Sequence, residues 1–246
     1  MNRTIQAVLF DLGDTLMYSL DSWPPVYERA GRKLSQTLRT NGITIDEDTF
    51  PTDFQQRLDK YYTDRDHNLF ETSTMAVLHD LLSNQGHPSV PKKLRREALD
   101  HFYATTQQNW QLEEDAIPTM TALQQAGYHL GLVSNAGDNR DVIQLAKKFG
   151  IGQYFDFILT SAACGYRKPH PRIFELALAN WGYMPDEIAM IGDRLDADVS
   201  GARPLGIFTI WIKRRAKKLN SPPITPDAAV ETLSEIPALL SHLSKP

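Results

Sequence analysis

A short apolar run at residues 188–191 is followed closely by three carboxylates, those of Asp193, Asp196 and Asp198. Such a run is typical of a buried parallel strand, which delivers the side chains after it to the carboxyl edge of a sheet. Carboxylates gathered at the end of one strand repel one another unless a cation lies among them, and hard divalent cations prefer oxygen ligands. The spacing therefore indicates a divalent metal site and disfavours simple helix capping by these acids.

A second apolar run, at residues 7–10, leads directly into Asp11. We expect this strand to deliver Asp11 to the sheet edge at which open α/β sheets bind their ligands. Asp14 follows three residues later. In an extended chain residues 11 and 13 share a face while residue 14 points to the other, so Asp14 is predicted to be a turn or capping acid unless the loop is locally twisted.

Two more segments carry groups suited to an anion. Ser134 and Asn135 end a predicted strand at 128–133, where a hydroxyl and an amide can donate hydrogen bonds, although such pairs are also common turn formers. Lys168 lies in a proline-bracketed loop just ahead of a predicted helix. A fixed cation in this place neutralises both a carboxylate nucleophile and a bound phosphate.

Together these segments resemble the four motifs of the haloacid dehalogenase superfamily, which occur here in the family's order and reach both ends of the chain. Residues 10–16 are similar to the first motif, Asp-x-Asp-x-Thr, with Gly13 where the family has its second aspartate. Lys168 followed by Pro169 is similar to the third motif, and residues 192–198 are similar to the Gly-Asp-x-x-x-x-Asp motif. The resemblance implies a Rossmann-like, doubly wound parallel sheet as the core, with an inserted α-helical cap.

The resemblance also implies a reaction and a metal. Asp11 would attack a phosphoryl group and form an aspartyl-phosphate intermediate. Mg²⁺ would be held by Asp11, the backbone carbonyl of Gly13 and Asp193, while Asp198 would orient Lys168 or the water ligands of the metal. The metal and the lysine together would offset the repulsion between the nucleophile and the phosphate, which are both anions.

The resemblance assigns Ser134, Asn135 and Lys168 to the phosphoryl oxygens. The predicted partner is a small phosphorylated metabolite, and the predicted function is that of a Mg²⁺-dependent phosphatase. Glycine at position 13 removes the family's general acid/base, whose help is worth roughly 10² to 10⁴ in rate. We therefore expect a slow enzyme, or one that acts on substrates with good leaving groups, and Asp14 is the candidate replacement acid.

Three alternatives remain open. The first is a haloacid dehalogenase, because the dehalogenases of the superfamily also lack an acid at the second place of the first motif and need no metal. The carboxylates at 193–198 argue against this alternative, since such an enzyme would not need them for Mg²⁺. A catalytically silent protein could use the phosphate pocket to sense a ligand. Phosphoryl transfer to an acceptor other than water is the third alternative.

The pattern along the chain predicts an α/β protein with two domains. Strands and helices alternate from about residue 113 onward, whereas residues 17–112 show helical periodicity alone. The simplest account is an α/β core domain of residues 1–16 and 113–246, interrupted after its first strand by a helical cap domain of residues 17–112. Helices of the cap are expected where apolar residues recur at three-to-four spacing, at 26–38, 54–62, 75–82 and 94–102.

The chain has 246 residues, of which 41% are hydrophobic, and a formal net charge of −4, as expected of a protein with one large core and a smaller lobe. No apolar run approaches the ~20 residues that span a bilayer, and the lone Cys164 agrees with a reducing compartment, so a cytoplasmic location is the default expectation. The basic run at 213–218 lacks interleaved aromatic residues, which favours a solvated loop over a nucleic-acid site. The sequence leaves the oligomeric state open.

Overall fold

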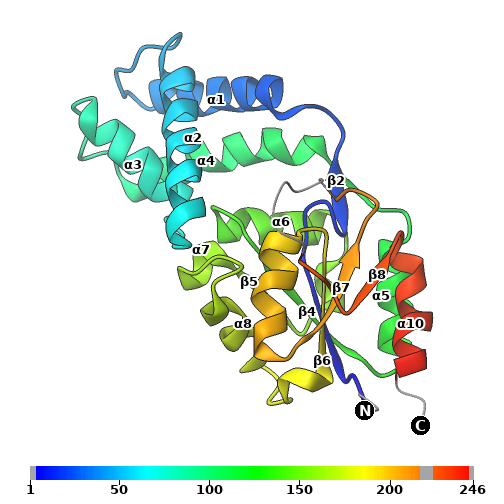
Figure 1. The fold of residues 1–246 in the computed structure, drawn as a ribbon. Helices are drawn as coiled ribbons and strands as arrows, with labels where there is room; N and C mark the ends of the chain where they lie inside the picture. Colours follow the sequence, from blue (N-terminus) through cyan, green and yellow to red (C-terminus); the bar gives the residue numbers. More distant parts are fainter. Residues whose placement is uncertain (1–3, 217–223, 244–246) are drawn as a thin grey trace. The chain divides into compact units, whose positions relative to one another are not determined.

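A computed structural model of the protein describes residues 4–216 and 224–243. The chain forms two compact units, one made of Met1–Tyr18 with Leu112–Pro246 and the other of Ser19–Gln111. Figure 1 shows the larger sheet in the first and long helices in the second, and we call them the α/β unit and the helical unit. Within the described residues, no helix combines the length and the apolar character that crossing a membrane requires.

The α/β unit is built on a six-stranded sheet in the order β5-β4-β1-β6-β7-β8, in which every neighbouring pair is parallel. Its strands are β1 (Ala7–Phe10), β4 (His129–Ser134), β5 (Phe157–Thr160), β6 (Ile188–Gly192), β7 (Phe208–Ile212) and β8 (Ala228–Val230). Both β1 and β6 are buried along their whole length, as expected of central strands in a parallel sheet. The predicted parallel α/β sheet is confirmed, and β8 is a strand that the sequence pattern did not reveal.

Helices flank this sheet. They are α5 (Ala116–Gln125), α6 (Asn139–Lys148), α7 (Ser161–Cys164), α8 (Pro171–Leu178), α9 (Ser200–Ala202) and α10 (Ile236–Leu243). The carboxylate of Asp138 caps α6 by accepting hydrogen bonds from its first turn, and Pro171 opens α8. Phe174 of α8 lies in one apolar cluster with Leu9 of β1 and Met190 of β6, so this cluster fixes α8 against the sheet.

The strand order of the sheet reverses at β1. Strands β4 and β5 extend the sheet on one side of β1, whereas β6, β7 and β8 extend it on the other. Phe10 of β1 is in register with both Leu132 of β4 and Ile191 of β6. The carboxyl ends of these three strands therefore meet at one edge of the sheet, at the switch point where open α/β sheets bind ligands.

The helical unit has a core of its own. It contains α1 (Trp23–Thr40), α2 (Phe50–Asn68), α3 (Thr74–Asn84) and α4 (Lys92–Thr106). All the segments that apolar spacing predicted to be helical are helical, and α1 ends just before Gly42, whose φ of +83° suits a glycine. Buried side chains of the four helices, such as Leu34, Phe54, Leu78 and Phe102, form one apolar cluster.

Two short strands lie where the chain passes from one unit to the other. β2 (Met17–Ser19) and β3 (Trp110–Leu112) pair as a two-stranded sheet. The sequence pattern predicted helix alone for this region, because a strand of three residues is too short to show an alternating pattern.

Part of the predicted basic loop also forms ion pairs. The guanidinium of Arg214 lies 2.7 Å from the carboxylate of Glu113 and 2.8 Å from that of Asp115, and Arg215 lies 2.8 Å from Glu113. Both arginines lie in a turn and Arg215 is exposed, but the sequence did not reveal these ion pairs because their partners are distant in the sequence. Residues 217 and 218 of the run lie outside the described residues.

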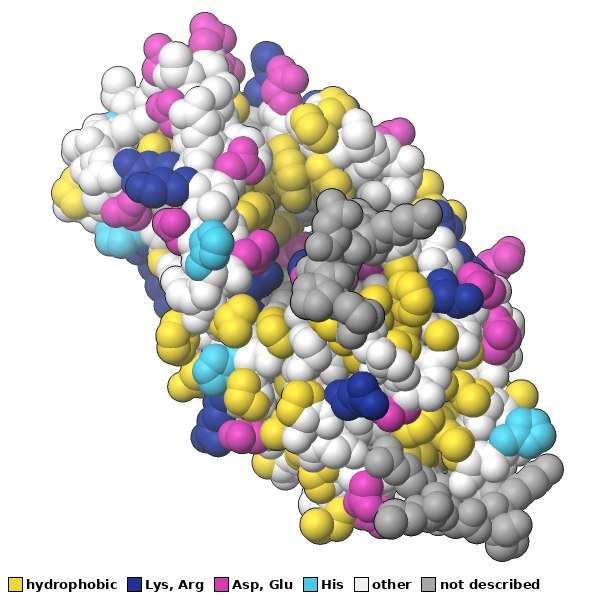
Figure 2. All heavy atoms as spheres, in the orientation of Figure 1, with side chains coloured by type: hydrophobic (Ala, Val, Ile, Leu, Met, Phe, Trp, Pro, Cys, Tyr) yellow, Lys and Arg dark blue, Asp and Glu magenta, His cyan; other side chains and the backbone are white. Residues whose placement is uncertain are grey.

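On the face that Figure 2 shows, Lys and Arg side chains are interspersed with Asp and Glu.

Candidate active site

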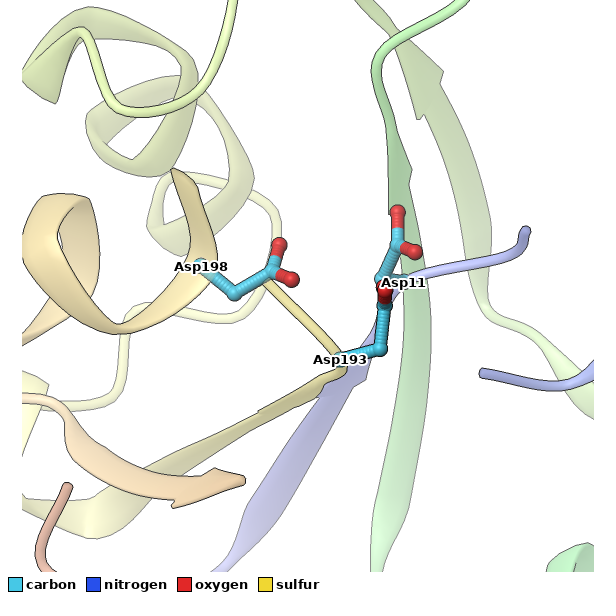
Figure 3. A group of neighbouring side chains, drawn as sticks. All are labelled: Asp11, Asp193 and Asp198. Atoms are coloured by element: carbon cyan, nitrogen blue, oxygen red, sulfur yellow. The ribbon is translucent and has the colours of Figure 1, made fainter. Parts of the chain in front are cut away.

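Three aspartates from two neighbouring strands and the turn after them converge at the carboxyl edge of the sheet (Figure 3). Asp11 directly follows β1 and Asp193 directly follows β6, and the Asp11 N–H donates a hydrogen bond of 2.9 Å to the carbonyl of Ile191. Asp198 lies in the turn Leu195–Val199 that comes next. One carboxylate oxygen of each aspartate lies within 4.8 Å of the others. The sequence motifs predicted this meeting because parallel strands end at the same edge.

Lys168 places its ammonium group between two of these carboxylates. Its Nζ lies 2.6 Å from Oδ1 of Asp11 and 2.7 Å from Oδ1 of Asp198. The same nitrogen donates a hydrogen bond of 2.8 Å to the carbonyl of Val133, at the end of β4. The side chain of Lys168 is only 2% exposed. Two hydrogen bonds and a second ion pair thus fix a buried cation beside Asp11.

The site carries an excess of buried negative charge. Burial and, after it, the nearby charges of Asp11, Asp198 and Asp14 together raise the pKa of Asp193 to about 8, against the opposing effect of Lys168. Burial also raises the pKa of Asp198 to about 6, against the opposing effect of Lys168. Burial alone would lower the pKa of Lys168, but the two carboxylates outweigh it and the net shift is upward. The single positive charge of Lys168 does not balance the carboxylates around it, and such a set of oxygens fits a hard divalent cation.

Local sequence explains how Asp198 reaches the cluster. Its Oδ2 accepts a hydrogen bond of 3.0 Å from the backbone N–H of Arg194. A Cβ atom on Gly192 would lie 2.1 Å from the same oxygen, so the close approach of Asp198 requires glycine there. Asp196 lies apart from the metal-ligand group and pairs with the Arg194 side chain, with 3.0 Å between Nε and Oδ1. Burial would raise the pKa of Asp196, but the hydrogen bonds from Arg194 outweigh it and lower the pKa.

Ser134 and Asn135, which are predicted to bind phosphate together with Lys168, differ in their surroundings. Ser134 is buried at the end of β4, next to the strand that carries Asp11. The side-chain amide of Asn135 is bound to the backbone of Lys168: its Oδ1 accepts from the Lys168 N–H at 2.8 Å, and its Nδ2 donates to the Lys168 carbonyl at 2.9 Å. The Asn135 side chain therefore holds the loop that presents the lysine. Its contact with a phosphate stays a prediction.

The loop after Asp11 is locally twisted. Asp14 has a φ of +57°, which is in the left-handed region that favours glycine but that aspartate also visits. Its N–H donates to the carbonyl of Met17 at 2.6 Å, and Gly13 forms an isolated bridge with the same residue. From the sequence, a catalytic role for Asp14 required a local twist of this loop, and the loop has such a twist. The charge of Asp14 is also one of the causes of the raised pKa of Asp193.

Two residues of the site had not been assigned a role from the sequence. The Thr15 hydroxyl accepts a hydrogen bond of 3.1 Å from the Asp193 N–H and lies 3.4 Å from Oδ2 of Asp11. The indole Nε1 of Trp211 donates a hydrogen bond of 2.8 Å to the Asp193 carbonyl. Thr15 could have been found as the last residue of the Asp-x-Asp-x-Thr pattern. Trp211 is an ordinary strand residue in the sequence and carries no local signal.

Comparison with known proteins identifies the family of the chain. A sequence model of the haloacid dehalogenase-like hydrolases matches residues 5–206, and the chain belongs to this family of hydrolases. The chain is 30% identical over 212 residues to the glyceraldehyde 3-phosphate phosphatase of Methanopyrus kandleri, with 85% of this chain and 84% of that protein covered. It is 29% identical to the ribulose-1,5-bisphosphate 5-phosphatase of Halopiger xanaduensis, with 83% of each covered.

A solved structure supports the fold. The crystal structure of a 2-haloacid dehalogenase from Pseudomonas syringae resembles this chain with a TM-score of 0.70, over 97% of this chain and 99% of that one. The two sequences are 23% identical. This likeness therefore bears on the fold and not on the reaction.

Proposed function

We propose that this hydrolase is a Mg²⁺-dependent phosphatase that acts on a small phosphorylated metabolite. The observation that carries the proposal is the arrangement around Asp11: a fixed lysine ammonium at 2.6 Å, beside a group of three carboxylates suited to a divalent cation. A carboxylate nucleophile needs both positive charges to approach a phosphate, whereas its attack on a carbon–halogen bond needs no metal. The phosphatase names of the relatives support the same reaction class.

In the proposed reaction, an Asp11 oxygen forms a bond to phosphorus as the bond from phosphorus to the leaving oxygen breaks. A water molecule then attacks phosphorus, and the aspartyl-phosphate bond breaks to release inorganic phosphate and the free carboxylate. Lys168, the Ser134 hydroxyl and the loop at Asn135 bind the phosphoryl oxygens. Asp11, Asp193 and the carbonyl of Gly13 would hold Mg²⁺, and Asp198 would contribute by orienting Lys168 or the water ligands of the metal. When bound, Mg²⁺ would offset the repulsion between the carboxylate nucleophile and the phosphate.

The test of this function is phosphate release with and without Mg²⁺. The substrates are p-nitrophenyl phosphate and acetyl phosphate, whose leaving groups depart with little protonation, followed by glyceraldehyde 3-phosphate and ribulose 1,5-bisphosphate. We expect Mg²⁺-dependent release from the first pair and from at least one metabolite. Halide release from a 2-haloacid without metal would instead support the dehalogenase alternative. Stabilisation by phosphate ligands without any turnover would support a silent binding protein.

We propose that Asp14 replaces the acid that Gly13 lacks. The twisted loop and the electrostatic effect of Asp14 on Asp193 both support a position near the reacting groups. Asp14→Asn is expected to lower kcat/KM for alkyl phosphates by about 10²-fold or more, because their leaving oxygen needs a proton. Hydrolysis of acetyl phosphate should change little. Steady-state kinetics on both substrates check this prediction.

Asp14→Gly is the matched control for the backbone. Glycine adopts a φ of +57° without strain, so this variant should keep the loop conformation and melt at a temperature close to that of the wild type. It should nevertheless lose alkyl phosphatase activity as Asp14→Asn does. Unchanged turnover of an alkyl phosphate by either variant rules out the acid role of Asp14.

A further inference from the structure

The peptide groups on the two sides of Asp193 are both fixed by side chains from neighbouring segments. On one side, the Asp193 N–H donates to the hydroxyl of Thr15, in the loop after β1. On the other, the Asp193 carbonyl accepts from the indole of Trp211, on β7. Gly192, the last residue of β6, is in register with Trp211, so the indole extends past the end of β6 to reach the next residue.

The bond from Trp211 has a particular chemical consequence. A free backbone carbonyl at this edge would be a hard oxygen that competes for the cation or turns toward water. An indole N–H is a donor only, so it can engage the carbonyl without bringing another acceptor into an already acidic site. With its N–H and C=O both engaged, the backbone at Asp193 has little freedom to rotate. The carboxylate is then held toward Asp11, as Figure 3 shows.

We propose that Trp211 is a positioning residue for the metal site and sets its affinity for Mg²⁺ through the carbonyl of Asp193. The inference rests on the proposed function, since it presumes that Asp193 is a ligand. Trp211 acts through the Asp193 backbone and is assigned no contact with the substrate. Loss of its N–H leaves the strand and the number of carboxylates unchanged but lets the Asp193 peptide rotate, so the Asp193 carboxylate is no longer held toward Asp11. The Mg²⁺ affinity should therefore fall, while turnover at saturating Mg²⁺ stays near that of the wild type.

The experiment measures Mg²⁺ binding to the intact protein by isothermal titration calorimetry, in the absence of substrate. Trp211→Phe keeps an aromatic ring and removes the N–H, and the Mg²⁺ dissociation constant is expected to rise about 5- to 10-fold, as for one net hydrogen bond. Trp181→Phe is the matched control. The indole of Trp181 also donates a hydrogen bond of 2.8 Å, but to the exposed carboxylate of Asp156. This control should bind Mg²⁺ as the wild type does.

A third variant separates the hydrogen bond from packing. Trp211→His retains a ring N–H and should bind Mg²⁺ more tightly than Trp211→Phe, with both variants checked for folding by circular dichroism. Equal Mg²⁺ affinity in the wild type and Trp211→Phe overturns the inference but not the proposed function. The same holds if Trp181→Phe weakens Mg²⁺ binding as much as Trp211→Phe does. Absence of Mg²⁺ binding by the wild type overturns the proposed function, and the inference falls with it.

Discussion

Asp11→Asn is expected to abolish Mg²⁺-dependent phosphate release, with a loss of at least about 10⁴-fold in kcat/KM. An amide is not a nucleophile toward phosphorus, and it lacks the charge that Lys168 and a divalent cation are arranged to offset. Asparagine is close in size to aspartate, and its side-chain oxygen can still accept the hydrogen bond from Lys168. The loss should therefore appear in catalysis rather than in folding. Turnover of acetyl phosphate and p-nitrophenyl phosphate measures it.

The same variant tests the covalent intermediate. Acid-quenched wild-type enzyme should yield a phosphorylated peptide that contains Asp11, and this species should be missing from Asp11→Asn. Asp196→Asn is the matched control, because Asp196 lies between the site residues Asp193 and Asp198 in the sequence but pairs with Arg194 and is absent from the metal-ligand group. It should keep nearly full activity. Residual turnover of Asp11→Asn within tenfold of the wild type contradicts a nucleophilic role for Asp11.

The sequence predicted the parts of the site that depend on strand ends. Asp11 and Asp193 each follow a short apolar run, and such runs form central parallel strands whose ends share one edge. The meeting of the two aspartates follows from that topology without knowledge of any side-chain contact. The same reasoning located Ser134 at the end of β4.

Contacts between distant segments could not be predicted in the same way. The bond from Trp211 to Asp193 depends on the register of β6 against β7, and no local pattern encodes that register. The pairing of Arg214 with Glu113 joins segments 101 residues apart, so charge counting along the chain could not reveal it. The twist at Asp14 is a third case, because aspartate occurs in both extended and left-handed turns.

Lys168→Met is expected to destabilise the metal-free protein by about 3–5 kcal/mol, the usual cost of removing one partner from a buried ion pair. The ammonium is the shared partner of Asp11 and Asp198, and methionine has a similar length but no charge. Activity should fall as well, because the metal would then be the only positive charge between the nucleophile and the phosphate. Urea unfolding in the presence of a chelator measures the loss of stability, and added Mg²⁺ should recover part of it.

The pH dependence of this loss separates charge from packing. Lys168 holds down the pKa of Asp198, which burial otherwise raises, so this pKa should be higher still in Lys168→Met. A carboxyl whose folded-state pKa lies above its unfolded value destabilises the fold increasingly as pH rises toward the folded value. The difference in unfolding free energy between wild type and variant should therefore be largest near pH 8 and shrink toward pH 5. A difference that does not change with pH would mean that Lys168 stabilises the site mainly by filling space.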